Sequence, residues 1–385
     1  MQSVVKKIYL HISEYFYNIF MHYLQKLKLA LVAVLISFCL IVQTAPATQL
    51  FKNKRSNPAW QQKSQDLFVI SNAMYDILIK VDDNTLSKYS SKYNIKKGFN
   101  GIIDRESLYS IIKESTAEKQ MAGGGSINTA SGLVNLGGSS ALSCIVSLDE
   151  FGKKFHTSVV QEGITPMIKF REKSNTGIVL IFITPDGERT MFANQGERLN
   201  FKSSDVDYDS IKQYKVLLTD GYTLLDKNFK PVFFKAVSKA KATNTHFAFA
   251  LSACGVVEQH RDFILSNVPN IDILFGNESE VMTLFGTSDL DQAIAKFQKI
   301  GNIGVFTMGS KGAIIVTKQG TIIIPPEKIA KVVDTTGAGD MFAAGFLHGY
   351  TRGLDLQTCG TIGSKAAAYI IQQLGARSQT KISYH

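Results

Sequence analysis

The amino-acid sequence predicts a doubly wound α/β fold, in which helices cover both faces of a mostly parallel sheet, with a small β-sheet beside it. Three observations support this prediction. Hydrophobic residues make up 45% of the 385 positions, enough to fill a large core. Short runs rich in Val, Ile and Phe alternate with helical stretches along most of the chain. Several of these runs are continuously apolar, as in strands that are buried on both faces of a sheet.

The elements of the main sheet are expected to begin close to residue 67. The predicted strands are 67–71, 216–219, 247–251, 273–275, 305–308 and 313–317. The predicted helices between them include 230–241, 278–285 and 290–299. A further helix is expected within 366–376, where a glycine ends it.

One region departs from this strand–helix alternation. Residues 177–184 and 188–193 are both strand-like, and Pro185-Asp186-Gly187 between them is a turn sequence. These residues predict a β-hairpin, which a strand near 99–103 would extend into the small sheet.

The formal net charge of +10 is concentrated at the N-terminus. Residues 1–65 contain eight Lys or Arg and one acid, whereas the remaining 320 residues contain 34 basic and 31 acidic residues. The main body is therefore close to neutral, which argues against nucleic acid as a partner, and no zinc-finger spacing is present. The four cysteines lie far apart and are expected to be free thiols in a reducing compartment.

An apolar run near the N-terminus fits three interpretations. Residues 29–42 are almost entirely apolar, with Lys26 and Lys28 before them and Ala45-Pro46-Ala47 after them. The run resembles a signal peptide. Residues 29–45 would equally suit an N-terminal membrane anchor. The third interpretation is an extension upstream of the true translation start.

These features divide the chain into three parts. Residues 1–47 form the N-terminal extension that contains the apolar run. Residues 48–65 are polar and basic and are predicted to be a linker. The folded domain is expected to span 66–385.

The strongest chemical signal is the sequence DTTGAGD at 334–340, which precedes an apolar-rich helix. Small residues at 337–339 allow backbone N–H groups to approach an anion, and a helix that begins there directs its positive dipole end to the same point. Such a site suits a polyphosphate or the charge that develops during phosphoryl transfer. Asp340 lies in the first turn, where its carboxylate is placed to take a proton from a hydroxyl group. The alternative is a glycine-rich turn that only caps a buried helix.

This heptapeptide resembles the signature of the PfkB/ribokinase family of carbohydrate and nucleoside kinases, over about residues 66–380. The resemblance implies a ribokinase-like α/β fold whose small sheet forms a lid, here about 77–104 and 165–195. It implies that Asp340 is the catalytic base. Two residues, Asp334 and Thr336, fall where the family binds a monovalent cation, usually potassium. The implied anion hole comprises Gly337, Ala338 and Gly339.

Two further stretches resemble the substrate site of the family. AGGGSIN at 122–128 resembles its N-terminal Gly-Gly signature, which implies that Gly124 and Asn128 contact substrate hydroxyls. Alone this motif is weak, and a turn before a helix is the alternative. Asn72 and Asp76 are expected just beyond the carboxyl end of the first strand, where α/β sheets bind ligands. The resemblance implies that Asp76 grips two sugar hydroxyls, whereas by itself it also fits a turn.

Two motifs resemble the nucleotide site. NESE at 277–280 follows an apolar strand and opens a helix, and it matches the Asn-x-x-Glu motif of the family. This match implies that Asn277 and Glu280 organise Mg²⁺ and the ATP phosphates, with Glu280 acting on the metal through water. An ordinary capped helix start is the alternative. TMGSKG at 307–312 resembles the turn beneath the nucleotide, and the contacts that it implies come from Thr307, Gly309 and Gly312.

Two single residues are weaker candidates for substrate binding. Arg189 lies on the predicted hairpin, from where it reaches the transferring phosphate or stays at the surface. Tyr222 follows the strand 216–219 and is a candidate to stack on a purine, with core packing as the alternative.

Together these residues and the resemblance predict an ATP-dependent kinase that phosphorylates a primary hydroxyl group, and the resemblance implies Mg²⁺ and K⁺ as its cofactors. Adenosine is the favoured acceptor, because the spacing of Asn72 and Asp76, the AGG at 122–124 and the stretch 97–104 resemble adenosine-kinase-like members. A sugar kinase for ribose, fructose or a related sugar is the alternative within the family.

A non-catalytic, membrane-tethered nucleoside or sugar sensor is an alternative from another class. The presence of Asp340, Asn277 and Glu280 argues against it. Because ATP is cytoplasmic, the kinase domain is expected in the cytosol, either free or anchored by the N-terminal segment. The chain is expected to be a monomer or a homodimer.

Overall fold

The computed structural model describes residue 60 and residues 62–196, 200–378 and 380–382. By its internal contacts the chain divides into two units, Met1–Lys52 and Asn53–His385, and every residue described below belongs to the second. The expected extension, its apolar run and most of the expected linker lie outside the described residues. In the described part of the chain, no helix is long and apolar enough to cross a membrane.

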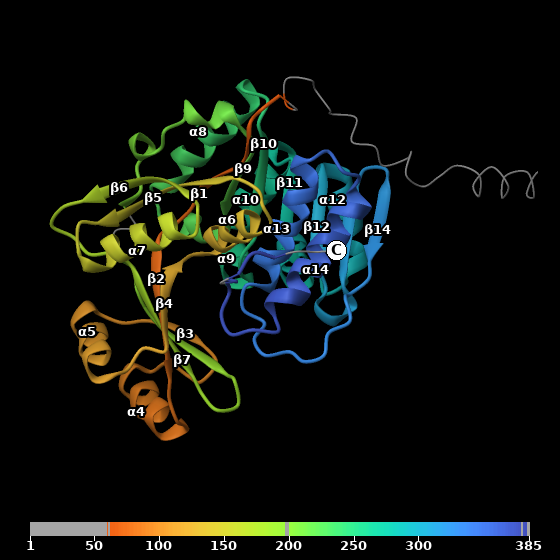
Figure 1. Cartoon of the computed structure of the whole chain (residues 1–385). Helices are drawn as coiled ribbons and strands as arrows, with labels where there is room; N and C mark the ends of the chain where they lie inside the picture. Colours follow the sequence, from red (N-terminus) through yellow and green to blue (C-terminus); the bar gives the residue numbers. More distant parts are fainter. Residues whose placement is uncertain (1–59, 61, 197–199, 379, 383–385) are drawn as a thin grey trace, which may run out of the picture. The chain divides into compact units, whose positions relative to one another are not determined.

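Nine strands form the larger of two sheets. In chain order they are β1 (Gln65–Ile70), β5 (Ser140–Ser147), β6 (Thr165–Arg171), β9 (Tyr214–Asp220), β10 (His246–Ala250), β11 (Ile273–Asn277), β12 (Ile303–Thr307), β13 (Ala313–Thr317) and β14 (Gly320–Ile324). They lie side by side in the order β14-β13-β12-β11-β10-β9-β1-β5-β6 (Figure 1). Neighbouring strands from β12 to β6 are parallel, whereas β12–β13 and β13–β14 are antiparallel. The expected mostly parallel sheet is confirmed.

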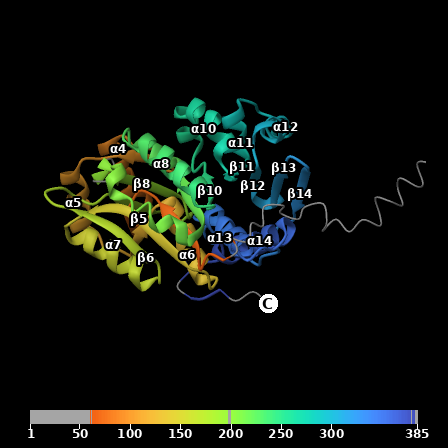
Figure 2. The same cartoon turned by 90° about the horizontal axis from the view of Figure 1, so that it is seen from above.

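Helices cover both faces of this sheet. One group consists of α8 (Phe229–Ala242), α9 (Cys254–Gln259), α10 (Arg261–Asn267), α11 (Glu278–Phe285) and α12 (Leu290–Ile300). The other consists of α6 (Gly125–Asn135), α7 (Glu150–Gln161), α13 (Ala338–Thr351) and α14 (Leu356–Ile370). Figure 2 shows α8, α10, α11 and α12 on one side of the sheet and the second group on the other. The three helices predicted over 230–241, 278–285 and 290–299 correspond to α8, α11 and α12.

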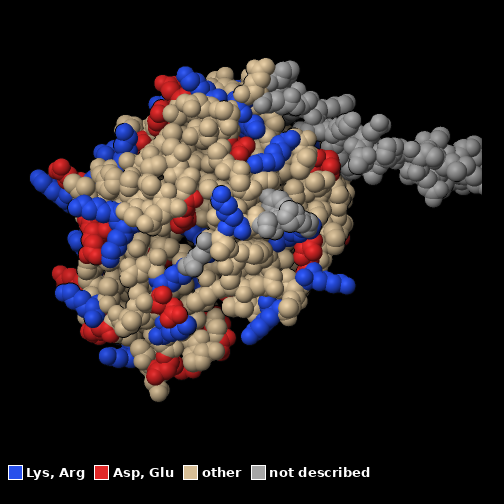
Figure 3. All heavy atoms as spheres, in the orientation of Figure 1, with Lys and Arg blue, Asp and Glu red and all other residues tan. Residues whose placement is uncertain are grey.

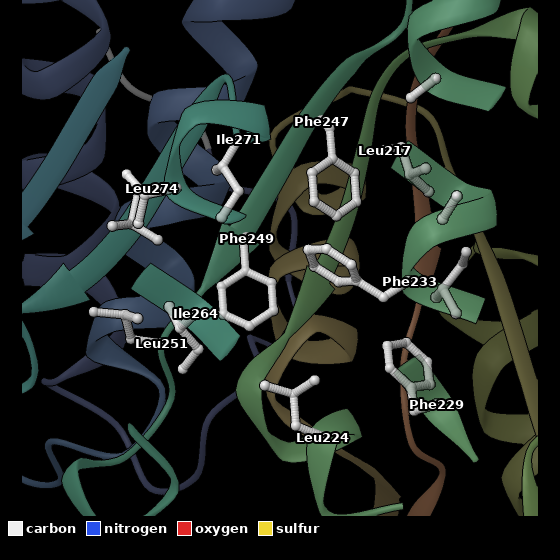
Figure 4. Close-up of a cluster of buried hydrophobic side chains, with 14 of the residues drawn as sticks. Leu217, Leu224, Phe229, Phe233, Phe247, Phe249, Leu251, Ile264, Ile271 and Leu274 are labelled. Carbon is white, nitrogen blue, oxygen red and sulfur yellow. The ribbon is translucent and has the colours of Figure 1, made fainter. Parts of the chain in front are cut away.

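A large hydrophobic core lies between the sheet and the first helix group. Phe233 of α8 packs edge-on against Phe247 and Phe249 of β10, with ring centroids 5.3 and 6.0 Å apart (Figure 4). Each of these fully buried rings removes a large apolar area from water, which stabilises the fold by roughly 2–3 kcal/mol. This packing fixes the central strands, whose carboxyl ends carry several of the candidate site residues.

On the opposite face, α13 and α14 approach each other closely. A Cβ at Gly345 of α13 would lie 2.7 Å from the carbonyl oxygen of Ile362 and 2.8 Å from the Cα of Gly363, both on α14. Glycine at these positions therefore lets the two backbones meet. The final helix, α14, ends at Ile370 rather than at Gly375, where the expected helix ends, and turns follow it.

The smaller sheet contains five strands, in the order β3-β8-β7-β2-β4. They are β2 (Met74–Lys80), β3 (Asn100–Ile102), β4 (Lys119–Gly123), β7 (Ile178–Ile183) and β8 (Arg189–Asn194), and the chain also forms α4 (Asp83–Tyr93) and α5 (Arg105–Glu114) here. The predicted hairpin is present as β7 and β8. The limits differ from the expected 77–104 and 165–195, because 165–171 form β6 of the larger sheet and β4 was not anticipated.

The packed part of the chain extends further toward the N-terminus than residue 66. Trp60, within the expected linker, is only 4% exposed; its ring stacks on His246 at a centroid distance of 5.1 Å. Its Nε1 donates to the carbonyl of Lys215 at 2.9 Å. Lys63 Nζ donates to the carbonyl of Tyr214 at 2.9 Å. The last part of the expected linker, 48–65, therefore packs against the folded domain through Trp60 and Lys63.

The charged surface of the described residues is mixed in sign. Figure 3 shows Lys and Arg interspersed with Asp and Glu over one face. Local ion pairs account for part of this mixture: Lys97 contacts Asp83 at 2.7 Å and Asp186 at 2.6 Å.

Candidate active site

A cavity of about 580 Å³ lies where the parallel strands end and the smaller sheet faces them. Its walls include the carboxyl ends of β1, β9, β11 and β12 and the first turns of α6 and α13. This edge of a parallel sheet is where α/β folds bind ligands. Thirteen of the seventeen predicted site residues line the cavity: Asn72, Asp76, Gly124, Asn128, Tyr222, Asn277, Glu280, Thr307, Thr336, Gly337, Ala338, Gly339 and Asp340. The other four are Asp334, Arg189, Gly309 and Gly312.

The DTTGAGD motif forms a tight turn that opens α13. Gly337 has a φ of +77°, which favours glycine, and a Cβ there would lie 2.6 Å from the Cβ of Ala376. Ala338 N–H donates to the carbonyl of Thr335 at 3.2 Å, so this amide of the expected anion hole is already engaged. Around Gly339, a Cβ would meet nothing within 4 Å, so the cavity approaches the first helical turn closely at this residue. The helix N-terminus thus presents its positive end to the cavity.

Asp340 sits half-buried in the first turn of α13 and faces Asn128 of α6. Asn128 Nδ2 donates to Asp340 Oδ2 at 2.9 Å. Burial raises the pKa of Asp340 to about 7, and the hydrogen bond from Asn128 partly opposes this rise. A carboxyl group with a pKa close to neutrality suits proton abstraction at physiological pH.

Asp76 lies within β2 rather than in the loop or turn expected from the sequence. Its carboxylate abuts Gly123 of β4, where a Cβ would lie 2.2 Å from Asp76 Oδ1. Burial raises the pKa of Asp76 to about 7, and Arg377 and Arg189 act in the opposite direction. The following Gly124 has a φ of +122°, so the turn into α6 requires glycine.

Asn72 and Tyr222 are connected to each other. Asn72 Nδ2 donates to the carbonyl of Tyr222 at 2.9 Å, so this donor is engaged in joining the end of β1 to the turn after β9. The Tyr222 ring borders the cavity, and it would lie 3.7 Å from a Cβ on Gly125. Because Tyr222 is only half-buried and lines the cavity, it differs from an ordinary core tyrosine.

Asn277 and Glu280 form a capping box at the start of α11. Asn277 Oδ1 accepts from Glu280 N at 2.9 Å, and Glu280 Oε2 accepts from Asn277 N at 3.0 Å. The motif therefore does cap the start of a helix, which was the alternative to a nucleotide site, but both residues also line the cavity. Burial raises the pKa of Glu280, and the backbone hydrogen bond opposes this rise.

The turn after β12 shapes the rim of the site. Thr307 lines the cavity, whereas Gly309 and Gly312 do not. Both glycines have positive φ, +58° and +90°, and a Cβ at Gly312 would lie 2.1 Å from the carbonyl oxygen of Ile324. These two glycines therefore serve the turn, and their contact with a nucleotide remains a prediction.

The Asp334 carboxylate does not line the cavity and has three partners that donate to it. Its Oδ1 accepts from Thr336 N at 3.0 Å and its Oδ2 accepts from Gly375 N at 2.7 Å. Arg189 of β8 forms an ion pair with the same carboxylate, and its side chain is 12% exposed. Arg189 therefore does not stay at the surface, and it contacts Asp334. A monovalent cation near Asp334 and Thr336 would have to rely on other oxygens or displace this arginine.

Two charged residues at the site were not anticipated from the sequence. Asp220, at the end of β9, is buried in the cavity wall and accepts from Ser71 Oγ at 2.7 Å and from Ser126 N at 3.3 Å. The sequence did hold one indication of a role for Asp220, since it directly follows the predicted strand 216–219, at the edge where α/β sheets bind ligands. Arg377 donates from Nε to Asn128 Oδ1 at 2.8 Å, and no local motif indicated it.

Comparison with known proteins agrees with this geometry. A model of the pfkB family of carbohydrate kinases matches residues 102–382. The adenosine kinase of Saccharomyces cerevisiae is 26% identical over 341 residues, which cover 83% of this chain and 98% of the yeast protein.

Two solved structures resemble the whole domain. A probable sugar kinase from Rhizobium etli has a TM-score of 0.76 at 31% identity, covering 82% of this chain and 96% of that chain. The adenosine kinase from Sinorhizobium meliloti has a TM-score of 0.76 at 30% identity, covering 82% and 97%. These matches confirm the expected ribokinase-like fold, and the matched region includes both glycine-rich motifs. The chain therefore belongs to the pfkB family of carbohydrate kinases and is an ATP-dependent carbohydrate or nucleoside kinase.

Proposed function

We propose that this kinase phosphorylates the primary hydroxyl group of a nucleoside and that adenosine is its favoured acceptor. The observation that carries the proposal is the cavity itself, which is lined both by Asp340, in the first turn of α13, and by an apolar wall that suits a flat base. Met74, Val179, Ile181 and Met191 of the smaller sheet form this apolar wall. A free sugar offers little apolar surface to such a wall, whereas a nucleobase does.

In the proposed mechanism, Asp340 removes the proton of the acceptor hydroxyl group. The amides at the start of α13, with Gly337, Ala338 and Gly339, stabilise the negative charge of the transferring phosphoryl group. Because Ala338 N–H is held by Thr335, Gly339 contributes more of this stabilisation. Tyr222 borders the same cavity and is proposed to stack on the base.

The acceptor is proposed to bind through the polar groups opposite the apolar wall. Asp76, Gly124 and Asn128 contact its ribose hydroxyls. Asn72 acts through Tyr222, because its amide is bonded to the carbonyl of that residue. Arg189, now paired with Asp334, is proposed to reach the phosphate when that pair opens.

Asn277, Glu280 and Thr307 are proposed to hold the ATP phosphates and Mg²⁺, together with the turn that contains Gly309 and Gly312. Mg²⁺ would supply charge neutralisation of the phosphates, and it needs few protein carboxylates because it retains waters. The buried Glu280 fits this role, since its Oε2 is held by the helix cap and its carboxyl group lines the cavity. Activation by K⁺ at Asp334 and Thr336 is a further part of the proposal, as are a cytosolic location of the domain and a monomeric or dimeric state.

The full 385-residue chain should be tested for ADP release from Mg-ATP with a panel of nucleosides and sugars, in K⁺ and in Na⁺ buffers. We expect turnover with adenosine, loss of turnover in Asp340→Asn, and lower activity without K⁺. Turnover with ribose or fructose alone would retain the kinase and reject the nucleoside. Equal rates in K⁺ and Na⁺ would reject the cation proposal only.

A further inference from the structure

A buried arginine near the C-terminus reaches the candidate base through one intermediate side chain. Arg377 is 4% exposed, and its Nε donates to Asn128 Oδ1 at 2.8 Å. The other end of the same amide, Nδ2, donates to Asp340 Oδ2 at 2.9 Å. We propose that Arg377 is a positioning residue, which holds the Asn128 amide so that it presents N–H rather than C=O to the Asp340 carboxylate. The inference rests on the proposed role of Asp340 as the base.

The two ends of an asparagine amide have nearly the same shape but opposite hydrogen-bonding character. A half-turn of the Asn128 amide would place its oxygen against the Asp340 carboxylate, where the two acceptors repel each other unless the carboxyl group is protonated. A guanidinium group has only donors, so Arg377 selects Oδ1 as its partner. The amide is thereby left with Nδ2 toward Asp340, in the orientation that favours an ionised base.

Glu162, which follows α7, holds Arg377 in place. Arg377 Nη1 donates to Glu162 Oε1 at 2.9 Å and to Oε2 at 3.1 Å. Glu162 Oε1 also accepts from Ser158 Oγ at 3.0 Å, and Ser158 Oγ accepts from Ala122 N at 3.2 Å. The arginine is therefore anchored to the strand that leads into the glycine-rich turn before Asn128, and its buried charge is paired.

The backbone around Arg377 is tied to the other half of the site. Gly375 N donates to Asp334 Oδ2 at 2.7 Å. Ala376 packs against Gly337, where a Cβ would come within 2.6 Å of the alanine Cβ. Three consecutive residues, 375–377, thus contact Asp334, Gly337 and Asn128 in turn. These contacts set the position from which the Arg377 side chain extends.

Burial is the largest influence on the pKa of Asp340, and four other groups act on it: Asn128 of α6, Asp220 at the end of β9, Glu280 of α11, and Arg377 in the segment after α14. The two acids raise the pKa of Asp340, while the Asn128 hydrogen bond and the Arg377 charge lower it. Arg377 is the cation in this set. Its loss therefore removes a favourable charge and releases the amide, and both effects make Asp340 harder to ionise.

The test compares Arg377→Met and Arg377→Lys with the wild type in the full-length chain, using whichever acceptor the wild type phosphorylates. For Arg377→Met, we expect the acid limb of kcat/KM to move up by about one pH unit, with a roughly fivefold loss of rate at pH 7 that approaches tenfold at lower pH. Arg377→Lys retains a charge but cannot bond Asn128 and both Glu162 oxygens in the same fork, so it should recover only part of the loss. In an Asn128→Ala background, Arg377→Met should cause a clearly smaller loss in kcat than in the wild type, because only the effect of the Arg377 charge remains when the intermediate side chain is absent.

Glu162→Gln is the matched control, since its amide oxygen can still accept from Arg377 Nη1 and keep the arginine in place, while the charge that pairs with Arg377 is removed. It should lower the thermal midpoint without raising the acid limb. If Arg377→Met fails to fold, Arg377→Met/Glu162→Gln removes both charges of the pair and should still show the shift. An equal shift in Glu162→Gln, or an additive loss in the Asn128→Ala background, would overturn the proposal.

A second measurement does not depend on turnover. In ligand-free protein labelled with ¹³C at aspartate carboxyl carbons, the signal that disappears in Asp340→Asn reports the titration of this group. Its midpoint should rise in Arg377→Met, and an unchanged midpoint would refute the positioning role. If no acceptor is phosphorylated, the proposed function fails, and this titration still decides the role of Arg377.

Discussion

Replacing Asp340 with Asn should make the ligand-free protein more stable above neutral pH while it removes the kinase activity. Burial raises the pKa of Asp340 to about 7, against 3.8 in an unperturbed chain. Ionising such a group at pH 8 costs the folded state at most ~4 kcal/mol. Since the side chain is half-buried and lines a cavity, solvent screens part of this cost, and we expect a gain of about 1–2 kcal/mol.

The pH dependence of this gain has a definite sign. The folded protein binds the Asp340 proton more tightly than the unfolded chain. The free energy of unfolding of the wild type therefore falls as the pH rises from about 4 to about 7, and the full cost of ionisation remains above pH 7. Below pH 4 both states hold the proton, and the two proteins should unfold alike. The Asn variant also retains an oxygen that can accept from Asn128, so no hydrogen bond needs to be lost.

Urea unfolding of both proteins at pH 4.5 and pH 8, with ADP release measured in parallel, tests this reasoning. Loss of the base should reduce kcat by roughly 10²–10⁴-fold. Asp186→Asn is a suitable control, because hydrogen bonds from Lys97 and Thr184 hold the pKa of this exposed aspartate below its usual range. That variant should not gain stability at pH 8. The reasoning is refuted if Asp340→Asn is no more stable than the wild type at pH 8, or if its gain is the same at both pH values.

Three further outcomes follow from the same structure. The kcat/KM of the wild type should fall about tenfold per pH unit below pH 7, as Asp340 takes up its proton; a flat profile down to pH 5.5 would contradict this. Gly345→Ala should destabilise the protein by about 1–3 kcal/mol, because the added Cβ would lie 2.7 Å from the Ile362 carbonyl oxygen. An unchanged thermal midpoint would show that α13 and α14 can move apart at no cost. Glu280→Gln keeps an oxygen for the cap at Asn277 but loses its charge, so the Mg²⁺ concentration for half-maximal activity should rise without a loss of thermal stability. An unchanged Mg²⁺ requirement would remove Glu280 from the proposed metal site.

The sequence predicted the strands of the larger sheet best where they are continuously apolar. Two strands that it did not predict show why. The segment SALSCIVS of β5 contains serines at 140, 143 and 147 that are fully or almost fully buried, so a buried strand looked polar. The segment TPMIKFR of β6 contains Pro, Lys and Arg, which an edge strand tolerates.

The candidate site was predictable to the extent that local motifs carry it. The DTTGAGD turn depends on small residues and a helix start, and both are local properties of the chain. Asp76 was misplaced because the chain enters β2, a strand of the smaller sheet, after only three residues beyond β1, which strand–helix alternation alone does not reveal. Arg377 was missed because its meaning comes from Asn128, a residue 249 positions away, and no spacing rule connects the two.

The charges around the cavity explain why stability and activity should favour opposite sides of neutral pH. Burial raises the pKa of Asp76, Asp220, Glu280 and Asp340, so the ligand-free site resists ionisation at each of them. The nearby arginines offset this only in part, because each is already paired with a carboxylate of its own. Protonation removes the cost of burying these charges and stabilises the fold, but it would also disable Asp340 in its proposed role as the base, which requires the carboxylate. On the proposed mechanism, the arrangement that costs the folded protein free energy at pH 8 is therefore the one that serves phosphoryl transfer. Substitutions that neutralise these acids should accordingly increase stability and decrease activity together.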